Sequence, residues 1–524
     1  MKQSHENPAV SDLEAAVFDL DGVLTDTAAV HASAWKAIFD DVLREHAEAT
    51  GIEFVPFDKD DDYRTYVDGR PRYDGVENFL TSRGIVRERG EPSDDPELDT
   101  YCGIGNRKND VFLQRLDAEG VRVFPDAIAA LDRLAANGVR IGLHTSSRNG
   151  RPVLTAGGII DRFEAIVDGN DLLTLGIPGK PDPAPFREVA YMLGVEPNDA
   201  AVIEDATAGV RSGRRGGFGI VVGVARGEAD AEELLAHGAD VVVEELTELD
   251  DDPRTWRRLG AAPPRPLDEV PEATADAVME RLGGRTPVVF CDFDGVLSEI
   301  VNDPDAATMT DANRDALREL TKRCPVAVVS GRGAPDVAGR LGLEGLYVAG
   351  SHGFELIAPD GSHSVQDRAA AKATELAAAA EALEAEVGGI DGVLVENKRF
   401  SIAVHFRNAD PSTHERVQAA VIAEGERRGL ISSGGKMIRE LRPPLPWDKG
   451  AAVIDLLGRI APDPDAPAIY LGDDLTDEDA FRVLRGWGVS VAVRGGDHDT
   501  VADLAVDDPD GIAALLAGLG RRLA

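Results

Sequence analysis

Two short acidic motifs, far apart in the sequence, each carry a pair of carboxylates at a spacing that suits phosphoryl transfer. The first pair is Asp19 and Asp21, and the second is Asp292 and Asp294. Each pair directly follows an apolar run typical of a buried strand and precedes a glycine that lets the chain turn close to a ligand. One carboxylate can attack phosphorus while the other transfers protons. The sequence therefore predicts two catalytic centres of the same kind.

A hydroxyl group, a lysine and further acidic residues follow each Asp-x-Asp pair in the same order. They are Thr145, Lys180, Glu204 and Asp205 in the first half, and Ser330, Lys449, Asp473 and Asp474 in the second. A hydroxyl and a lysine can hold and neutralise a phosphoryl group during transfer. Clustered carboxylates are the ligands that Mg²⁺ prefers. We therefore expect each half to bind Mg²⁺ and a phosphorylated substrate.

Alternating helices and strands must position these residues. Pro125 opens a predicted helix, which ends at Gly138, and residues 139–143 follow as a buried strand. This alternation is typical of a parallel, doubly wound sheet, where ligands gather beyond the carboxyl ends of the strands. We predict an α/β protein with two doubly wound parallel-sheet cores, in which the motif residues lie at the carboxyl ends of the strands.

The position of the longest insertion differs between the halves. In the first half it precedes Thr145, and we predict a helical cap at about 33–117. In the second half it follows Ser330, and we predict an α+β cap at about 354–440. Such caps can close over a substrate and exclude water. Because the insertion points differ, we infer a fusion of two distinct relatives, not a recent duplication.

The stretch between the two motif sets is rich in proline and charge, which is typical of a linker. We therefore predict a first domain at 1–249, a linker at 250–284 with little core of its own, and a second domain at 285–524. A length of 524 residues is compatible with this division.

Composition narrows the class of protein. The formal net charge of −39 and the lack of a basic stripe argue against binding to nucleic acid. No apolar run approaches the length of a membrane span, and no signal peptide is readable, so we predict a cytoplasmic protein. The three cysteines suit neither a disulfide framework nor a zinc site. The oligomeric state stays open.

The ordered motifs resemble those of the haloacid dehalogenase superfamily, whose fold both halves are expected to share. Within it, the second half resembles the trehalose-6-phosphate phosphatases through residues 302–306, 350–353, 396–398, 435–437, 440–443 and 472–481. The resemblance implies Mg²⁺-dependent hydrolysis of trehalose 6-phosphate through an aspartyl phosphate on Asp292. Asp294 would act as acid and then as base. Another sugar phosphate stays an alternative substrate.

The same resemblance implies roles for further residues of the second half. Mg²⁺ would be held by Asp292, the carbonyl of Asp294 and Asp473, while Ser330 and Lys449 would hold the phosphoryl oxygens. The implied substrate-binding residues are Arg332, His352, Glu396, Lys398, Lys436, Glu440 and Arg442. A phosphorylated disaccharide needs several such polar partners.

The first half contains matching elements at residues 18–27, at His31 and Trp35, and at residues 69–72 and 107–110. Through them it resembles β-phosphoglucomutases and related phosphatases over roughly 14–245, although the acidic run at 57–62 departs from them. The resemblance implies Mg²⁺ binding by Asp19, Asp21, Glu204 and Asp205. It also implies substrate contacts from His31, Arg72 and Lys108, the last two as a second phosphate site. A generic sugar phosphatase and a non-catalytic regulatory module remain alternatives for this half.

Overall fold

The computed structural model describes residues 13–59, 61–67, 72–226, 231–259, 264–301, 306–435, 437–461, 463, 466–496 and 498–524. The chain divides into two compact units. The first unit comprises Ser11–Arg211 and Ile220–Gly260, and the second includes Ser212–Gly219 and Ala261–Ala524.

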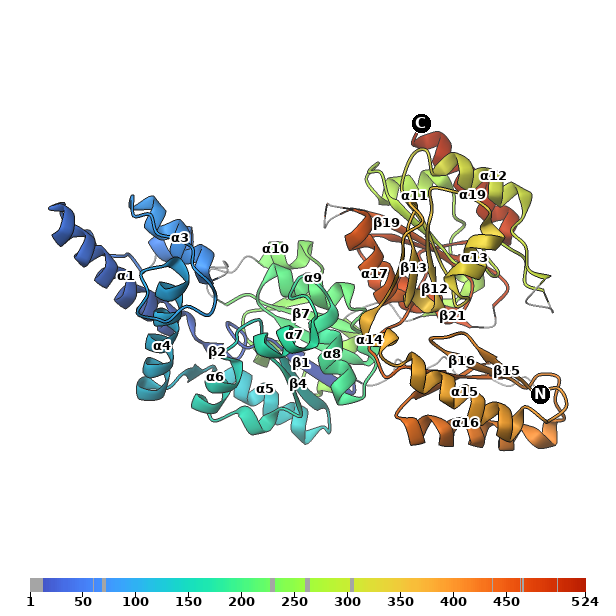
Figure 1. The fold of residues 1–524 in the computed structure, drawn as a ribbon, viewed down its shortest axis with the longest axis horizontal. Coiled ribbons are helices and arrows are strands. Elements are labelled where there is room, and N and C mark those ends of the chain that lie inside the picture. Colours follow the sequence, from blue (N-terminus) through green and yellow to red (C-terminus); the bar gives the residue numbers. More distant parts are fainter. Residues whose placement is uncertain are drawn as a thin grey trace. The chain divides into compact units, whose positions relative to one another are not determined.

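A six-stranded parallel sheet forms the core of the first unit (Figure 1). Its strands, in order across the sheet, are β5 (Ala165–Val167), β4 (Arg140–His144), β1 (Ala15–Phe18), β6 (Ala200–Glu204), β7 (Ile220–Val224) and β8 (Val241–Val243). The central strands β1, β6 and β7 are apolar except for Glu204 at the end of β6, because both faces of the sheet are covered. Ile141 and Leu143 of β4 pack in the cluster that includes Leu131, whereas Gly142 faces Val189 on the opposite side.

The helices of this core connect the strands, as the sequence predicts. They are α5 (Pro125–Ala136), α6 (Gly150–Ala156), α7 (Gly169–Leu175), α8 (Ala184–Leu193), α9 (Thr207–Arg215) and α10 (Ala231–Ala236). The helix predicted to open at Pro125 is α5, and the strand predicted after Gly138 is β4, so both predictions are confirmed.

A helical cap is inserted between β2 (Thr25–Asp26) and β3 (Arg122–Val123), which pair with each other where the chain leaves and re-enters the core. The cap helices are α1 (Ala28–Thr50), α2 (Asp61–Tyr66), α3 (Arg72–Ser82) and α4 (Tyr101–Glu119). They enclose a small aromatic core of their own, in which Phe39 contacts both Phe57 and Phe79. The cap is helical, as predicted.

An eight-stranded sheet forms the core of the second unit. Its strands, in order, are β14 (His363–Val365), β13 (Glu355–Ile357), β12 (Tyr347–Gly350), β11 (Val326–Val329), β10 (Val288–Cys291), β19 (Ala468–Gly472), β20 (Val489–Val493) and β22 (Leu504–Val506). The six strands from β12 to β22 are parallel, whereas β13 and β14 are antiparallel. Residues 355–365 of the predicted cap range therefore lie in the core sheet instead.

The helices of the second core are α11 (Ala275–Arg281), α12 (Asp311–Leu320), α13 (Ala334–Leu341), α17 (Lys449–Ile460), α18 (Asp477–Leu484) and α19 (Pro509–Arg522). The second cap is α+β, as predicted. Its antiparallel sheet has the order β15 (Leu394–Asn397), β16 (Ile402–His405), β18 (Ile438–Arg442) and β17 (Ile431–Gly435), and its helices are α14 (Asp367–Ala370), α15 (Ala373–Val387) and α16 (His414–Arg428). Helices α15 and α16 pack on this sheet around one apolar cluster.

The segment at 250–284 is more ordered than the linker that the sequence predicts. Trp256 is fully buried in the apolar cluster of the first unit. Val270 and Val278 are buried in clusters of the second unit, and β9 (Arg265–Pro266) pairs with β21 (Asp499–Thr500). Apolar side chains within this proline-rich stretch therefore give both units part of their core, which corrects the prediction of a linker with little core.

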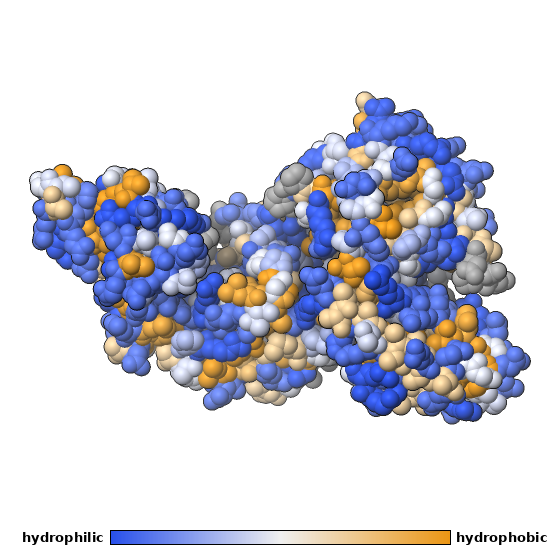
Figure 2. Space-filling model, viewed as in Figure 1, coloured by the Kyte–Doolittle hydropathy of each residue, from blue (hydrophilic) through white to orange (hydrophobic). Residues whose placement is uncertain are grey.

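Hydrophilic residues cover most of the face drawn in Figure 2, with apolar residues in small groups between them. Among the described residues, no helix combines the length and the apolar character needed to cross a bilayer. The three cysteines are buried and unpaired.

Candidate phosphoryl-transfer sites

The second unit places its Asp-x-Asp pair at the centre of the sheet edge. Asp292 directly follows β10, which lies between β11 and β19. Ser330 follows β11 and Asp473 follows β19, so three parallel strands bring these residues to one edge. Asp292 is buried, and its Oδ1 accepts a hydrogen bond from the N–H of Phe293 at 2.6 Å. Motif residues that are far apart in the sequence are thus clustered in space.

Lys449 neutralises this cluster from the first turn of α17. Its Nζ donates to Asp292 Oδ2 at 2.6 Å and to Asp477 Oδ1 at 2.7 Å, and it lies 3.7 Å from Asp474 Oδ1. Although burial opposes the charged form, these carboxylates hold the pKa of Lys449 well above its usual value. The side chain is only 2 % exposed, so the ammonium is a fixed charge beside the candidate nucleophile.

Three carboxylates of this unit could hold a metal ion. Ligand atoms of Asp292, Asp473 and Asp477 all lie within 4.8 Å of one another. Burial, together with repulsion between the carboxylates, raises the pKa of Asp292 to about 8 and that of Asp473 to about 9. A hard divalent cation would relieve this repulsion, and carboxylate oxygens are the donors that Mg²⁺ prefers. The residues present therefore fit such an ion.

Close backbone approach at Gly295 keeps this carboxylate cluster compact. Gly295 has a φ of 75°, and a Cβ built there would lie 2.0 Å from Asp473 Oδ2. A side chain at this position would displace Asp473, so the glycine of the Asp-x-Asp-Gly motif serves the cluster through space as well as through the turn.

Asp477 is the functional candidate that the sequence interpretation missed. It is buried at the start of α18 and accepts hydrogen bonds from Lys449, from the Tyr470 hydroxyl at 2.7 Å and from the N–H of Asp473 at 2.8 Å. The available signal was an acidic residue one helical turn after Asp473. This spacing alone does not separate an inward-facing carboxylate from a solvated one.

The candidate acid and base, Asp294, is held differently from Asp292. The Arg332 guanidinium donates to both of its oxygens, from Nε at 2.7 Å and from Nη2 at 2.8 Å. This two-point pairing fixes the orientation of the carboxylate. The side chain of Asp294 lies outside the three-carboxylate group, so its predicted metal contact depends on its main-chain carbonyl. Arg332, predicted to bind substrate, contacts the acid–base candidate instead in this structure.

Three cap residues predicted to bind substrate lie close to the core or to each other. Glu440 Oε1 on β18 lies 3.7 Å from His352 Nε2 of the core. Although burial opposes it, interaction with His352 lowers the pKa of Glu440 to about 2. Lys398 Nζ lies 3.7 Å from Glu396 Oε2, which is also 3.2 Å from His405 Nε2. These charged groups form a polar wall suited to sugar hydroxyls.

The remaining predicted cap residues are less well defined by contacts. Arg442 ends β18, and its buried Nε has no hydrogen-bond partner among the described residues. Lys436 lies outside the described residues, as do residues 302–305 of the resemblance motif. The structure therefore does not test a role for Lys436.

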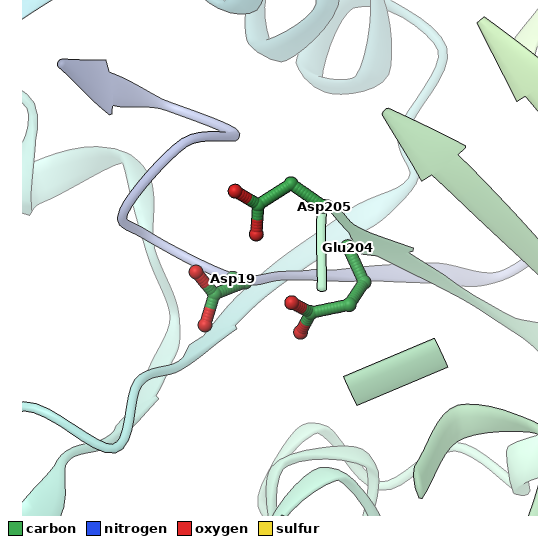
Figure 3. A group of neighbouring side chains, drawn as sticks. All are labelled: Asp19, Glu204 and Asp205. Carbon is green, nitrogen blue, oxygen red and sulfur yellow. The ribbon is translucent and has the colours of Figure 1, made fainter. Parts of the chain in front are cut away.

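The first unit builds an equivalent centre at the end of β1 (Figure 3). Asp19, Glu204 and Asp205 offer ligand atoms within 4.8 Å of one another, so this group could also hold a metal ion. Lys180 pairs with Asp19 and donates to Glu204 Oε2 at 2.7 Å. Burial raises the pKa of Asp19 to about 8. Thr145 follows the neighbouring strand β4 and is buried at the same sheet edge.

The second aspartate of this motif is held by a hydroxyl. Asp21 Oδ1 accepts a hydrogen bond from Thr27, whereas its counterpart in the second unit pairs with an arginine. Burial raises the pKa of Asp21. Gly22, with a φ of 83°, lies so close to Asp205 that a built Cβ would be 1.8 Å from its Oδ2. The carboxylate of Asp21 lies outside the three-carboxylate group.

The three cap residues predicted for substrate in the first unit gather near this centre. Lys108 is buried on α4, and its Nζ lies 2.7 Å from His31 Nδ1. Burial and the charge of Arg72 lower the pKa of Lys108 to about 7, and burial with Lys108 holds the pKa of His31 well below its usual value. Arg72 Nη2 donates to Asn109 Oδ1 at 2.8 Å, which also accepts from Asn149 of the core.

Family models match both units. A model described as trehalose-phosphatase matches residues 290–510, and one described as haloacid dehalogenase-like hydrolase matches residues 13–217. The trehalose-phosphate phosphatase of Mycobacterium tuberculosis (strain H37Rv) is 43% identical over 341 residues, which cover 64% of this chain and 84% of that protein. The superfamily resemblance and the α/β fold class are thereby confirmed.

The chain also resembles a much longer protein. An uncharacterized glycosyl hydrolase of the same mycobacterial strain is 42% identical over 493 residues, or 93% of this chain. This chain spans only 36% of that relative's length. A solved structure of β-phosphoglucomutase from Clostridium difficile is 25% identical, with a TM-score of 0.36, and covers 47% of this chain and 96% of that one.

Proposed function

Because the chain belongs to the trehalose-phosphate phosphatase family, we propose that its second unit hydrolyses trehalose 6-phosphate to trehalose and phosphate. The observation that carries this proposal is the contact of buried Lys449 with Asp292 at 2.6 Å, beside two further carboxylates. A fixed ammonium next to a buried carboxylate suits attack on a phosphoryl group, since positioning and charge neutralisation dominate this chemistry.

The proposed reaction has two steps. Asp292 attacks phosphorus and forms an aspartyl phosphate, while Asp294 protonates the departing sugar oxygen. Asp294 then takes a proton from the water that hydrolyses this intermediate. Ser330 and Lys449 hold the phosphoryl oxygens in both steps. Arg332 must yield one carboxylate oxygen of Asp294, since its guanidinium contacts both in the structure.

We propose Mg²⁺ as the metal of both units. Asp292, Asp473 and Asp477 would hold it in the second unit, and Asp19, Glu204 and Asp205 in the first. When bound, the ion would neutralise charge on the phosphoryl oxygens. The predicted ligand set of the second unit gains Asp477, while the main-chain carbonyl of Asp294 and the residue Asp21 remain proposed ligands. Glu396, Lys398, Glu440 and Arg442 are proposed to contact the sugar.

For the first unit we propose phosphoryl transfer on a smaller phosphosugar, with a β-phosphoglucomutase-like exchange as the leading candidate. The observation that favours a mutase is the placement of Lys108 of the cap, which is close enough to interact with both Asp21 and Arg72. A mutase must hold a second phosphate while the sugar turns, and these cations suit it. The complete contact set of Lys180 with Asp19 and Glu204 argues against a non-catalytic module.

Phosphate release from a sugar-phosphate panel by the full chain with Mg²⁺ tests both proposals. We expect Asp292→Asn to abolish release from trehalose 6-phosphate and Asp19→Asn to leave it nearly intact, so that each variant is the control for the other. Conversion of β-glucose 1-phosphate to glucose 6-phosphate should depend on Asp19 alone. Loss of trehalose 6-phosphate hydrolysis in Asp19→Asn alone would contradict the assignment. Phosphate release without isomerisation would identify the first unit as a phosphatase.

A further inference from the structure

The turn between β15 and β16 of the second cap carries a contact that reaches the core sheet. Arg399 lies in this turn with a φ of 70°, a left-handed conformation that is costly for a residue with a Cβ. Its N–H donates to Asn397 Oδ1 at 2.9 Å, and the N–H of Lys398 donates to Ser401 O at 2.9 Å. Strained conformations persist where surrounding contacts fix them. The turn therefore fixes the backbone from which the Arg399 side chain, which is 60 % exposed, extends.

Arg399 pairs with a buried carboxylate at the start of β13. Its Nη1 donates to Glu355 Oε1 at 3.1 Å, and Glu355 is only 4 % exposed. The other oxygen of Glu355 accepts from the N–H of Ala334 at 3.1 Å, in the first turn of α13. A buried carboxylate is costly without such donors. Glu355 thus connects the tip of the cap hairpin to the start of α13.

The loop before α13 holds the residues proposed for the phosphoryl side. Ser330 lies in this loop, and Arg332, two residues later, pairs with Asp294. The N–H of Ser351 donates to Arg332 O at 2.6 Å, and that of His352 donates to Ser330 O at 2.9 Å. Ser351 Oγ in turn lies 3.4 Å from Lys398 O of the cap hairpin. These hydrogen bonds therefore form one continuous set of contacts. The set joins the cap turn at Lys398 to the loop at Ser351 and to the loop that holds Ser330 and Arg332.

We propose that Arg399 and Glu355 are positioning residues that hold the hairpin bearing Lys398 and Glu396 against the phosphoryl-binding loop. The pair would fix the distance between the sugar-binding wall and the nucleophile, so it matters for a phosphorylated disaccharide that contacts both. A small aryl phosphate contacts only the phosphoryl side and needs no such spacing. This inference rests on the proposed function and adds to it a dependence on substrate size.

Steady-state kinetics of the full chain on trehalose 6-phosphate and p-nitrophenyl phosphate test the pair. Loss of one charge-assisted hydrogen bond should raise the KM for trehalose 6-phosphate in Arg399→Met by roughly fivefold to tenfold. The KM for p-nitrophenyl phosphate should stay within about twofold, because a small ester bypasses the cap. Arg399→Lys should recover part of the loss, since it keeps the charge without the planar fork.

Two further variants sharpen the test. Glu355→Gln keeps an acceptor for the Ala334 N–H but removes the charge, so it should raise the same KM, and the double variant should add little. Arg407 is an exposed arginine of the same cap, just beyond β16, and Arg407→Met should leave both KM values unchanged. Hydrogen exchange at Ala334 should be faster in Arg399→Met than in the wild type or Arg407→Met.

The outcomes separate the two levels of inference. An equal rise in KM for both substrates, or no rise for trehalose 6-phosphate, would overturn the positioning role. If the wild type hydrolyses p-nitrophenyl phosphate but not trehalose 6-phosphate, the proposed function fails instead. In that case the rate of hydrogen exchange at the Ala334 N–H tests the contact between Arg399 and Glu355 by itself. An unchanged rate in Arg399→Met would overturn the proposed pair.

Discussion

Replacing Lys449 by methionine should destabilise the second unit strongly when no metal is present. The ammonium lies 2.6 Å from Asp292 and 2.7 Å from Asp477, at 2 % exposure. Removing one partner from a buried ion pair costs about 3–5 kcal/mol, since the carboxylates left behind must stay buried as charges or take up protons. For a unit of this size each kcal/mol lowers the unfolding temperature by about 2–4 °C, so we expect a drop of roughly 10 °C.

Differential scanning calorimetry of the full chain in a chelator measures this drop. Hydrogen exchange of peptides from α17 assigns the transition to the second unit. Mg²⁺ should restore part of the loss in Lys449→Met, because a bound cation replaces the missing charge and stabilises by mass action. The matched control is Lys322→Met, since Lys322 is 58 % exposed and pairs with Glu319 at 2.5 Å in the same unit.

The control substitution should shift the unfolding temperature far less than Lys449→Met does, because exposed ion pairs contribute little to the free energy of unfolding. An unfolding temperature of Lys449→Met within 2 °C of the wild type in chelator would refute the reasoning. It would mean that the carboxylates of this unit are neutralised without the ammonium.

Two further predictions concern the carboxylate clusters. Asp292 and Asp473 have folded pKa values of about 8 and about 9, above the usual 3.8, so the folded state binds more protons than the unfolded state in this range. The metal-free protein should therefore lose stability as pH rises from about 4 to 9, and unfolding temperatures in chelator at pH 5.5 and 8.5 check the sign. Gly295→Ala should abolish phosphate release from trehalose 6-phosphate, since its Cβ would lie 2.0 Å from Asp473 Oδ2. Gly283→Ala, also at positive φ but with nothing within 4 Å, should keep full activity, and loss in both variants would point to backbone strain alone.

The motif residues could be predicted from the sequence because they depend on strand ends. Asp292, Ser330 and Asp473 each directly follow a buried apolar strand, and parallel strands bring such positions to one edge. The contacts of the caps could not be predicted in this way. The approach of Glu440 to His352 and of Arg399 to Glu355 depends on how an inserted antiparallel sheet docks on the core. No local periodicity encodes that docking.

The antiparallel edge strands of the core sheet could not be predicted from local periodicity either. Strands β13 and β14 return antiparallel at the edge of a parallel sheet, within the range predicted as cap. Tight connections allow this, whereas parallel neighbours need a crossover. Because Glu355 begins β13, the edge strand also supplies the carboxylate that meets the cap.

In each unit the buried lysine contacts a second carboxylate besides the first aspartate of the Asp-x-Asp motif, but that carboxylate comes from a different element in each unit. In the first unit Glu204 ends β6 and reaches Lys180, and a Cβ built at Gly209, four residues after Asp205, would lie 1.9 Å from Glu204 Oε2. In the second unit the position that ends β19 is Gly472, where a built Cβ would lie 2.4 Å from the Cγ of Asp477.

In each unit, one of these two positions therefore supplies the additional carboxylate that contacts the lysine. It is the strand end in the first unit and the start of the following helix in the second. The complementary position is glycine because the space is already filled. Changing from one arrangement to the other requires a substitution at the strand end and another on the following helix. Either substitution alone would place two carboxylates, or none, in the space beside the lysine. This barrier agrees with the different cap insertion points, and together they favour fusion of two long-separated relatives over duplication within this chain.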